Sequence, residues 1–300
     1  MDIPNKNFSD WEYLNINDID IKKINDGLSN YMFLLSNEKV KPSSVILRIF
    51  GKSYYINRNI EIELYEKKLR FIPKLLHTYK DAIIIEKLDA NSLNYLDILQ
   101  EYISNIIIDY MIIIFKENIK FNDDKSIIFK YGDYMLSKIK LDNNFKNLKN
   151  YWIKNKYAIM QLNLNLVLCH NDLHKSNILI SNEKNIYFID FEYSGYNYYL
   201  YDIANFLNEL YYDYDINTSP YFLNKNRTEL LINYENNFIA KFNSKYSVSI
   251  NNDHLTLFKK ISHLFWCIWS LHIEYIENRN KNNFDYYQYA KSRYKNFLIL

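Results

Sequence analysis

A polar segment framed by two short apolar runs constrains this chain more than any other feature. Leu164 to Cys169 and Ile186 to Ile189 are apolar and have the length of strands, which predicts two strands on either side of a loop. The loop carries Asp172 and Asn177, and Asp190 follows the second run. Such a frame can bring these three side chains together. Taken singly, each of them could instead cap a turn or end a strand.

Length and composition indicate a folded chain without a general affinity for nucleic acid. The 300 residues suffice for one large domain or two modest ones. Hydrophobic residues make up 48% and charged residues 24%, which is ordinary for a globular protein. Because the formal net charge is only +2, nothing draws the chain to nucleic acid or to an anionic membrane surface, and any phosphate affinity must be local.

The cysteines and the apolar runs favour a cytoplasmic protein. Cys169 and Cys267 are too few for a disulfide framework, and we expect both in the core. Met1 to Asp10 has no apolar centre, so an ordinary secretory signal is not predicted. The most apolar run, Ile103 to Phe115, is shorter than the ~20 residues that cross a bilayer, so we predict a buried helix there and no membrane span.

The first part of the chain predicts a strand-rich lobe. Residues 10–25 space their apolar side chains for one helix face and predict a helix. Tyr31 to Leu35 and Val45 to Phe50 predict a β-hairpin. Ile60 to Leu69 should form a short helix, and Ala82 to Leu88 a buried strand.

The rest of the chain predicts a mainly helical lobe. Ser92 to Gln161 is mostly helical by pattern, and later helices are expected over Tyr201 to Leu210, Thr228 to Phe242 and Asp253 to Glu277. A strand-rich lobe followed by a helical one is an α+β arrangement. We therefore expect an N-terminal nucleotide-binding lobe over residues 1–88 and a C-terminal catalytic lobe over residues 89–300.

The polar segment resembles the catalytic loop of the protein-kinase-like fold. Residues 170–177 follow the pattern H-x-D-L-x-x-x-N, and Asp190 begins a segment that resembles D-F-G. The resemblance implies a bilobal fold, with a small antiparallel β-sheet lobe and a helical lobe, that uses ATP and Mg²⁺. It makes Asp172 the catalytic carboxylate, and Asn177 and Asp190 the magnesium ligands. We expect His170 to hold the loop from a buried position rather than to act with a cysteine as a nucleophile.

A second segment resembles the signature of choline and ethanolamine kinases. It runs from Ile189 to Asn197, continues over Asp202 to Asn205, and includes Glu209; Glu192 stands where a protein kinase has glycine. The resemblance implies phosphoryl transfer to choline, giving phosphocholine and ADP as the first step of phosphatidylcholine synthesis. Ethanolamine kinase, an aminoglycoside-phosphotransferase-like enzyme and an inactive kinase-like scaffold are the alternatives. A homodimer is implied by the family alone.

The same resemblance assigns nucleotide contacts in the first lobe. The turn over residues 26–30 is similar to the family's nucleotide loop, so Ser29 and Asn30 would bind phosphate. Arg48 stands where protein kinases have their ATP-contacting lysine, and Glu61 should pair with it. Alternatively, Arg48 is a solvated residue on a strand edge. The implied hinge contacts to adenine are Glu86, Lys87 and Leu88.

An aromatic pair near the end of the chain resembles the family's choline pocket. Trp266 and Trp269 are three residues apart, which places them on one helix face. A quaternary ammonium has no N–H and is held by ring faces beside a carboxylate, here Glu209. Without the kinase motifs, such a pair is more often part of a core. The residues implied to bind choline are Asp172, Tyr193, Glu209, Tyr214, Trp266, Trp269, Phe284 and Tyr289.

Overall fold

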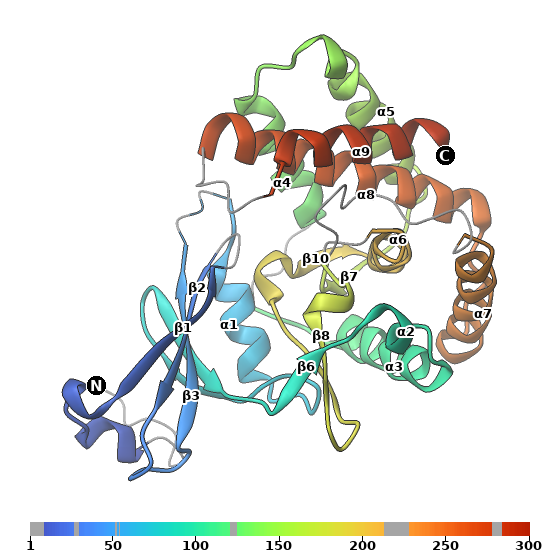
Figure 1. Ribbon diagram of the computed structural model, residues 1–300. Helices are drawn as coiled ribbons and strands as arrows, with labels where there is room; N and C mark the ends of the chain where they lie inside the picture. The colour runs from blue at the N-terminus through green and yellow to red at the C-terminus, as the bar shows by residue number, and fades with distance from the viewer. Residues whose placement is uncertain are drawn as a thin grey trace. The chain divides into compact units, whose positions relative to one another are not determined.

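The chain forms two compact units, each of which has its own secondary structure (Figure 1). The computed structural model describes residues 9–26, 30–51, 53, 55–120, 125–212, 228–277 and 284–300. The first unit comprises residues 1–92 and 178–192, and the second comprises residues 93–177 and 193–300. These units are defined by packing, and the predicted division into a nucleotide-binding lobe over residues 1–88 and a catalytic lobe over residues 89–300 stays a prediction.

The first unit is built on a five-stranded antiparallel sheet with the order β1-β2-β3-β5-β4. On β3, Val45 and Leu47 face an apolar cluster that includes Trp11. Successive side chains of a strand point to opposite faces, so Arg48 projects from the other face, where it meets the helix α1. The strands are β1 (Asp20–Asp26), β2 (Asn30–Ser36), β3 (Ser44–Phe50), β4 (Leu75–Thr78) and β5 (Ala82–Glu86), and α1 spans Arg58–Glu66.

The predicted hairpin, short helix and apolar strand of this unit are confirmed as β2 with β3, α1 and β5. A small antiparallel sheet of order β6-β8-β9 completes the unit. Its strands are β6 (Ala90–Ser92), β8 (Ile178–Ser181) and β9 (Ile186–Phe188). The chain leaves β9 two residues before Asp190, so the small sheet fixes the start of the segment that resembles D-F-G.

The predicted helix over residues 10–25 is wrong. Two short 3₁₀ helices, Ser9–Tyr13 and Ile16–Asp18, precede β1 instead. Trp11 and Ile19 still pack in or against the core cluster, as the apolar spacing indicated, but short 3₁₀ turns rather than an α-helix place them there. Residues Asp20 to Asp26 pair with β2, with one irregularity between Lys23 and Asn25, and this tertiary pairing outweighs a weak local helical pattern.

The second unit is mainly helical, and α8 lies at its centre. Buried residues occupy every position of α8 from Ile261 to its end, because other helices cover it on several sides. Figure 1 shows α9 alongside it. The helices are α2 (Tyr95–Ile98), α3 (Glu101–Lys116), α4 (Ile127–Lys138), α5 (Leu148–Met160), α6 (Tyr199–Glu209), α7 (Thr228–Tyr246), α8 (Asn252–His272) and α9 (Tyr286–Ile299), with a 3₁₀ turn at Asn143–Phe145 and a π-helical turn at Ile273–Glu277.

The helices predicted for this unit are confirmed, whereas α9 had no sequence prediction. The apolar run from Ile103 lies within α3 and is largely buried, as expected. In the described part of the chain, no helix has the length and apolar character needed to cross a membrane. The only strands described here are β7 (Leu166–Cys169) and β10 (Gly195–Tyr198), which pair antiparallel. Thus β7 carries the chain into the polar loop, and β10 and α6 lie beside it.

Candidate active site

Asp202 of α6 anchors the start of the predicted catalytic loop. Its carboxylate accepts backbone N–H bonds from His170 at 2.8 Å and from Asn171 at 2.6 Å. Burial raises the pKa of Asp202 to about 6, although the two backbone hydrogen bonds act in the opposite direction. His170 is fully buried, as predicted for a residue that holds the loop.

A network of amides fixes the backbone next to Asp172. Asn171 has a φ of 68°, a left-handed conformation that asparagine tolerates better than most residues. Its side chain donates to the Tyr193 carbonyl at 2.9 Å and accepts from Asn197 at 2.7 Å. Asn197 in turn accepts a 2.8 Å bond from the hydroxyl of Ser126, which also caps α4. The loop conformation is therefore tied to β10 and to α4.

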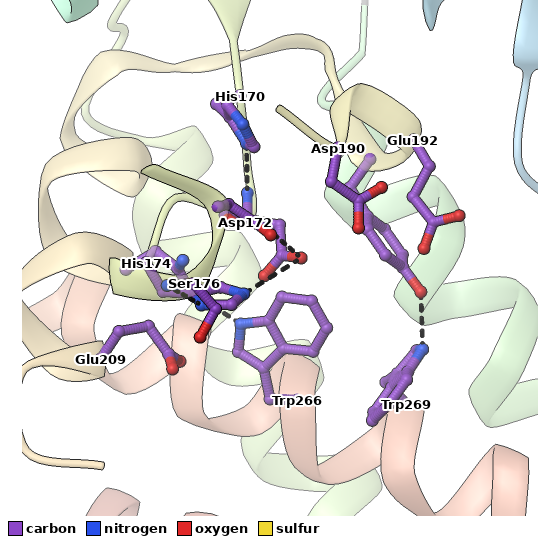
Figure 2. A network of polar contacts seen from close by, with 12 residues as sticks. His170, Asp172, His174, Ser176, Asp190, Glu192, Glu209, Trp266 and Trp269 are labelled. Atoms are coloured by element: carbon purple, nitrogen blue, oxygen red, sulfur yellow. Dashed lines mark hydrogen bonds and ion pairs between the residues drawn. The ribbon is translucent and has the colours of Figure 1, made fainter. Parts of the chain in front are cut away.

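Asp172 and Asn177 lie next to each other, as their spacing predicted. The Asn177 amide donates to the Asp172 carbonyl at 2.9 Å and to the Asp172 carboxylate at 3.4 Å. Nε2 of His174 is 3.9 Å from the same carboxylate, and the Asp172 N–H donates to Nδ1 of His170 at 3.4 Å (Figure 2). The Asn177 side chain thus closes the turn, which is the structural role considered as an alternative for it. The Asp172 side chain keeps 16% of its surface exposed. A carboxylate held in this way can accept a proton from a hydroxyl group.

Within the first unit, Arg48 lies in a cluster of buried charges. The predicted pair with Glu61 is confirmed at 2.6 Å, and Arg48 also contacts Asp190 at 2.5 Å. Arg58 bridges Glu61 at 3.1 Å and Glu192 at 2.9 Å. Only 4% of the Arg48 side chain is exposed, so the alternative of a solvated arginine on a strand edge is wrong. Two guanidinium groups thus face three carboxylates.

The protonation states in this cluster follow from burial and pairing. Burial opposes the charge on Arg48, yet Glu61 and Asp190 more than compensate and raise its pKa well above the usual value. Burial also raises the pKa of Glu61, against the effect of both arginines. Among the described residues of the cluster, carboxylates outnumber guanidinium groups by three to two. Asp190 has a φ of 66° and a side chain that is 36% exposed, so it is the accessible carboxylate among these.

The other predicted nucleotide contacts lie near this cluster in sequence or on the same sheet. Asn30 donates to the Glu192 carboxylate at 3.0 Å from the start of β2. Glu86 ends β5 and accepts a 2.8 Å bond from the Lys74 N–H, and Lys87 and Leu88 follow it. Ser29 lies outside the described residues. The nucleotide roles of all of these residues stay predictions.

The predicted choline-binding residues that the structure describes all belong to the second unit. Trp266 and Trp269 rise from the same face of α8, with ring centroids 5.5 Å apart (Figure 2). The Trp269 indole donates to the Tyr193 hydroxyl at 2.7 Å, and the Trp266 indole donates to Asn205 at 2.7 Å. Tyr289 of α9 lies 6.5 Å from the Trp269 ring. We call Tyr193, Trp266, Trp269, Phe284 and Tyr289 the aromatic cluster.

A ring contact, an ion pair and a small cavity lie beside the aromatic cluster. The Phe284 ring meets the Tyr289 ring edge to face, with centroids 5.4 Å apart. Glu209 at the end of α6 forms an ion pair with Arg293 of α9, and a cavity of about 10 Å³ touches Glu209, His174 and Tyr212. Such a volume holds about one water molecule. Tyr214 lies outside the described residues.

Sequence reasoning missed four residues that organise these groups. Asp202 and Asn197 were noted only as part of a family signature, and their contacts depend on which strand and helix lie beside the loop. Arg58 and Arg293 were not singled out at all. Arg293 follows Tyr289 by four residues, a helical spacing that would have placed both on one face if a helix had been predicted there.

Comparison with known proteins identifies the family. Residues 21–298 match the sequence profile of choline/ethanolamine kinases. The chain belongs to the choline/ethanolamine kinase family. A probable choline kinase from Arabidopsis thaliana is 25% identical and aligns with 94% of this chain and 86% of its own length. A probable ethanolamine kinase from the same plant is 27% identical, over 97% of this chain and 82% of its own length.

The fold of this choline/ethanolamine kinase family member agrees with a solved relative. Choline kinase from Cryptosporidium parvum superposes with a TM-score of 0.76, at 24% identity, over 98% of this chain and 92% of that chain. This likeness confirms the predicted protein-kinase-like α+β fold. Membership of a kinase family implies a transferase with ATP as a substrate and a small amino alcohol as the acceptor. The relatives include kinases of both choline and ethanolamine.

Proposed function

We propose that this family member transfers the γ-phosphoryl group of ATP to the hydroxyl of choline, giving phosphocholine and ADP. The observation that carries the proposal is the Asp172 carboxylate, held on a loop whose backbone is fixed by Asp202 and Asn171. Phosphoryl transfer depends mainly on positioning and on charge stabilisation, so a rigidly held carboxylate is what the acceptor hydroxyl requires.

Asp172 is the proposed catalytic residue. Its carboxylate would accept the hydroxyl proton of the acceptor as the oxygen attacks the γ-phosphorus. His170 and Asn177 fix the backbone on either side, so the carboxylate loses little orientational freedom when the acceptor binds. No covalent enzyme intermediate is needed, because the oxygen of the acceptor is itself the nucleophile.

Magnesium fits the residues proposed to hold it. Asn177 and Asp190 offer an amide oxygen and a carboxylate, which are hard oxygen ligands. Among the described residues, no group of three histidine, cysteine, aspartate or glutamate side chains could hold a metal ion by itself. Magnesium at kinase sites is usually held by one or two such residues, with phosphate oxygens completing the shell. When bound, it would neutralise developing charge on the phosphates.

The nucleotide is proposed to contact the first unit. Arg48 is the residue we expect at the phosphates, with Glu61 orienting its guanidinium group. Asn30 is held by Glu192 at the start of β2 and would contact phosphate. The backbone after β5 would meet the adenine. The proposed ATP contacts are Ser29, Asn30, Arg48, Glu61, Glu86, Lys87 and Leu88.

Choline is the proposed acceptor in preference to ethanolamine. The indoles of Trp266 and Trp269 have no hydrogen-bond acceptor, and their N–H groups donate to Asn205 and Tyr193, so these two side chains can offer an ammonium group ring faces but no partner for its N–H bonds. A trimethylammonium group needs only ring faces and a nearby negative charge, whereas a primary ammonium needs acceptors for three N–H bonds. A homodimer and a cytoplasmic location remain predictions from the family.

The test is an ATP-dependent phosphorylation assay with choline and ethanolamine at matched ATP and Mg²⁺. We expect turnover with a higher kcat/KM for choline. Asp172→Asn keeps the shape of the side chain but removes the base, so kcat should fall by about 10²- to 10⁴-fold with an unchanged Tm. Asp253→Asn, on the exposed first turn of α8, is the matched control and should retain full activity.

Two results would count against this proposal. Turnover with neither amino alcohol would remove the proposed activity altogether. If Asp172→Asn kept more than a tenth of the wild-type kcat, Asp172 would not be the base.

A further inference from the structure

The guanidinium group of Arg293 is buried between side chains that the acceptor site would use. Arg293 is fully buried and forms an ion pair with Glu209. Its Nε donates to the Tyr289 hydroxyl at 2.9 Å, and its Nη2 donates to the same oxygen at 2.6 Å. The guanidinium carbon lies 3.8 Å from the centroid of the Tyr212 ring and 4.9 Å from that of Tyr289.

These contacts occupy the Tyr289 hydroxyl oxygen and one carboxylate oxygen of Glu209, which could otherwise accept hydrogen bonds from a primary ammonium. A tyrosine hydroxyl oxygen has two lone pairs, and Arg293 donates to the Tyr289 oxygen twice. The negative charge of Glu209, predicted as the counter-charge to choline, is already balanced by Arg293. The nearby Trp266 and Trp269 contribute rings that have no hydrogen-bond acceptor for a primary ammonium.

The charges around this pair leave it close to neutral. His263 of α8 lies 3.5 Å from Arg293, and burial, reinforced by Arg293 and Lys259, lowers the pKa of His263 well below its usual value, so it stays uncharged. Lys259 is paired with Glu235. Within the described residues, Glu209 of α6 and Arg293 of α9 form the charged pair beside the rings of Tyr212 and Tyr289.

We propose that Arg293 is a positioning residue that sets the charge of the acceptor site and thereby favours a quaternary over a primary ammonium. It neutralises Glu209 and holds Tyr289, so the ammonium group is bound mainly by ring faces rather than by an unbalanced carboxylate. This inference rests on the proposed amino alcohol kinase activity. A merely structural ion pair between α6 and α9 would stabilise the fold without affecting the choice of acceptor.

Three acceptors separate charge from shape. Choline and 3,3-dimethylbutan-1-ol have the same shape, but only choline carries a positive charge, and ethanolamine is a cation that needs hydrogen-bond acceptors. In Arg293→Met the carboxylate of Glu209 loses its ion-pair partner, so its negative charge should favour the cationic acceptors over the neutral alcohol. We expect kcat/KM for choline relative to the neutral alcohol to rise at least about tenfold, and ethanolamine to gain on choline by a similar factor, with the KM for ATP unchanged.

Matched variants separate the charge of Arg293 from its packing. Arg293→Lys keeps the charge and should keep both ratios within about twofold, even if overall activity falls. The double variant Glu209→Gln with Arg293→Met removes both charges and should bring the ratios back toward wild type. Equal losses for all three acceptors in Arg293→Met would show a structural role only and overturn the inference.

A further variant keeps the test decisive if Arg293→Met does not fold. In Glu209→Gln the charge of Arg293 is unbalanced beside the ammonium, so choline should lose at least about tenfold relative to 3,3-dimethylbutan-1-ol. An unchanged ratio there would also overturn the inference. If the wild-type protein phosphorylates neither choline nor ethanolamine, the proposed function has failed instead, which distinguishes the two outcomes.

Discussion

Asp202 is a residue whose ionisation should cost stability while its hydrogen bonds support catalysis. It is buried, its carboxylate accepts the N–H groups of His170 and Asn171, and its pKa is about 6 in the folded protein against an ordinary value of 3.8. Because the folded pKa is the higher one, the folded state binds the proton more tightly than the unfolded state. The stability from this site is fully present below the ordinary pKa and is lost as the pH rises through about 6.

The perturbation is Asp202→Asn, which removes this titration. At neutral pH the variant avoids the cost of burying a charge, about 3 kcal/mol for a shift of this size. It also loses one acceptor, since the amide NH₂ now faces a backbone N–H, at a cost of about 1 to 3 kcal/mol. We therefore expect the variant to be about as stable as the wild type at neutral pH. Its kcat should nevertheless fall at least about tenfold, because one end of the loop before Asp172 is released.

Denaturant unfolding at two pH values tests this reasoning. Lowering the pH from about 7.5 to 5 should raise the stability of the wild type relative to Asp202→Asn by about 1 kcal/mol. Asp142→Asn is the matched control: hydrogen bonds, chiefly one from Tyr287, lower the pKa of Asp142, so this carboxylate stays ionised at both pH values and the stability of the wild type relative to this variant should not change. A difference between wild type and Asp202→Asn that stays constant with pH, or that grows in the other direction, would refute the argument.

Two further predictions concern packing and buried charge. In Gly132→Ala the new Cβ would lie 2.3 Å from the buried Trp152 ring, so we expect a loss of about 3 kcal/mol in the free energy of unfolding; less than about 1 kcal/mol in a urea titration would contradict this contact. Glu61→Ala removes the carboxylate shared by Arg48 and Arg58. Because Asp190 and Glu192 still pair with the two arginines, the free energy of unfolding should fall by about 2 kcal/mol, less than for an isolated buried ion pair. An unchanged free energy of unfolding in the same titration would show that Glu61 contributes nothing to stability.

The elements that sequence reasoning predicted well are those with strong local signals. The hairpin of β2 and β3 follows from two apolar runs around a polar turn, and α8 follows from a long helical pattern. The helix prediction for residues 10–25 failed because apolar residues three or four positions apart suit a 3₁₀ turn as well as an α-helix. The pairing of β1 with β2 then decided the outcome, and no local pattern reports such pairing.

In the candidate site, too, local contacts could be predicted from the sequence and long-range contacts could not. Asp172 and Asn177 are five residues apart in one motif, so their contact could be predicted from the sequence. The hydrogen bonds of Asp202 and the ion pair between Glu209 and Arg293 join residues that are far apart in the chain. Such contacts depend on how the helices pack. The sequence around a carboxylate such as Glu209 therefore does not identify the cationic side chain that pairs with it.

The tight packing of the aromatic cluster has a consequence for kinetics. Tyr193, Trp266, Trp269 and Tyr289 are each at most 5% exposed, and neighbouring rings meet edge to face. If choline binds there as proposed, its trimethylammonium group must separate rings that now touch, and part of its binding free energy is offset by that separation. Association of the acceptor should then be limited by the opening of the rings rather than by diffusion, and its observed rate should level off as the acceptor concentration rises.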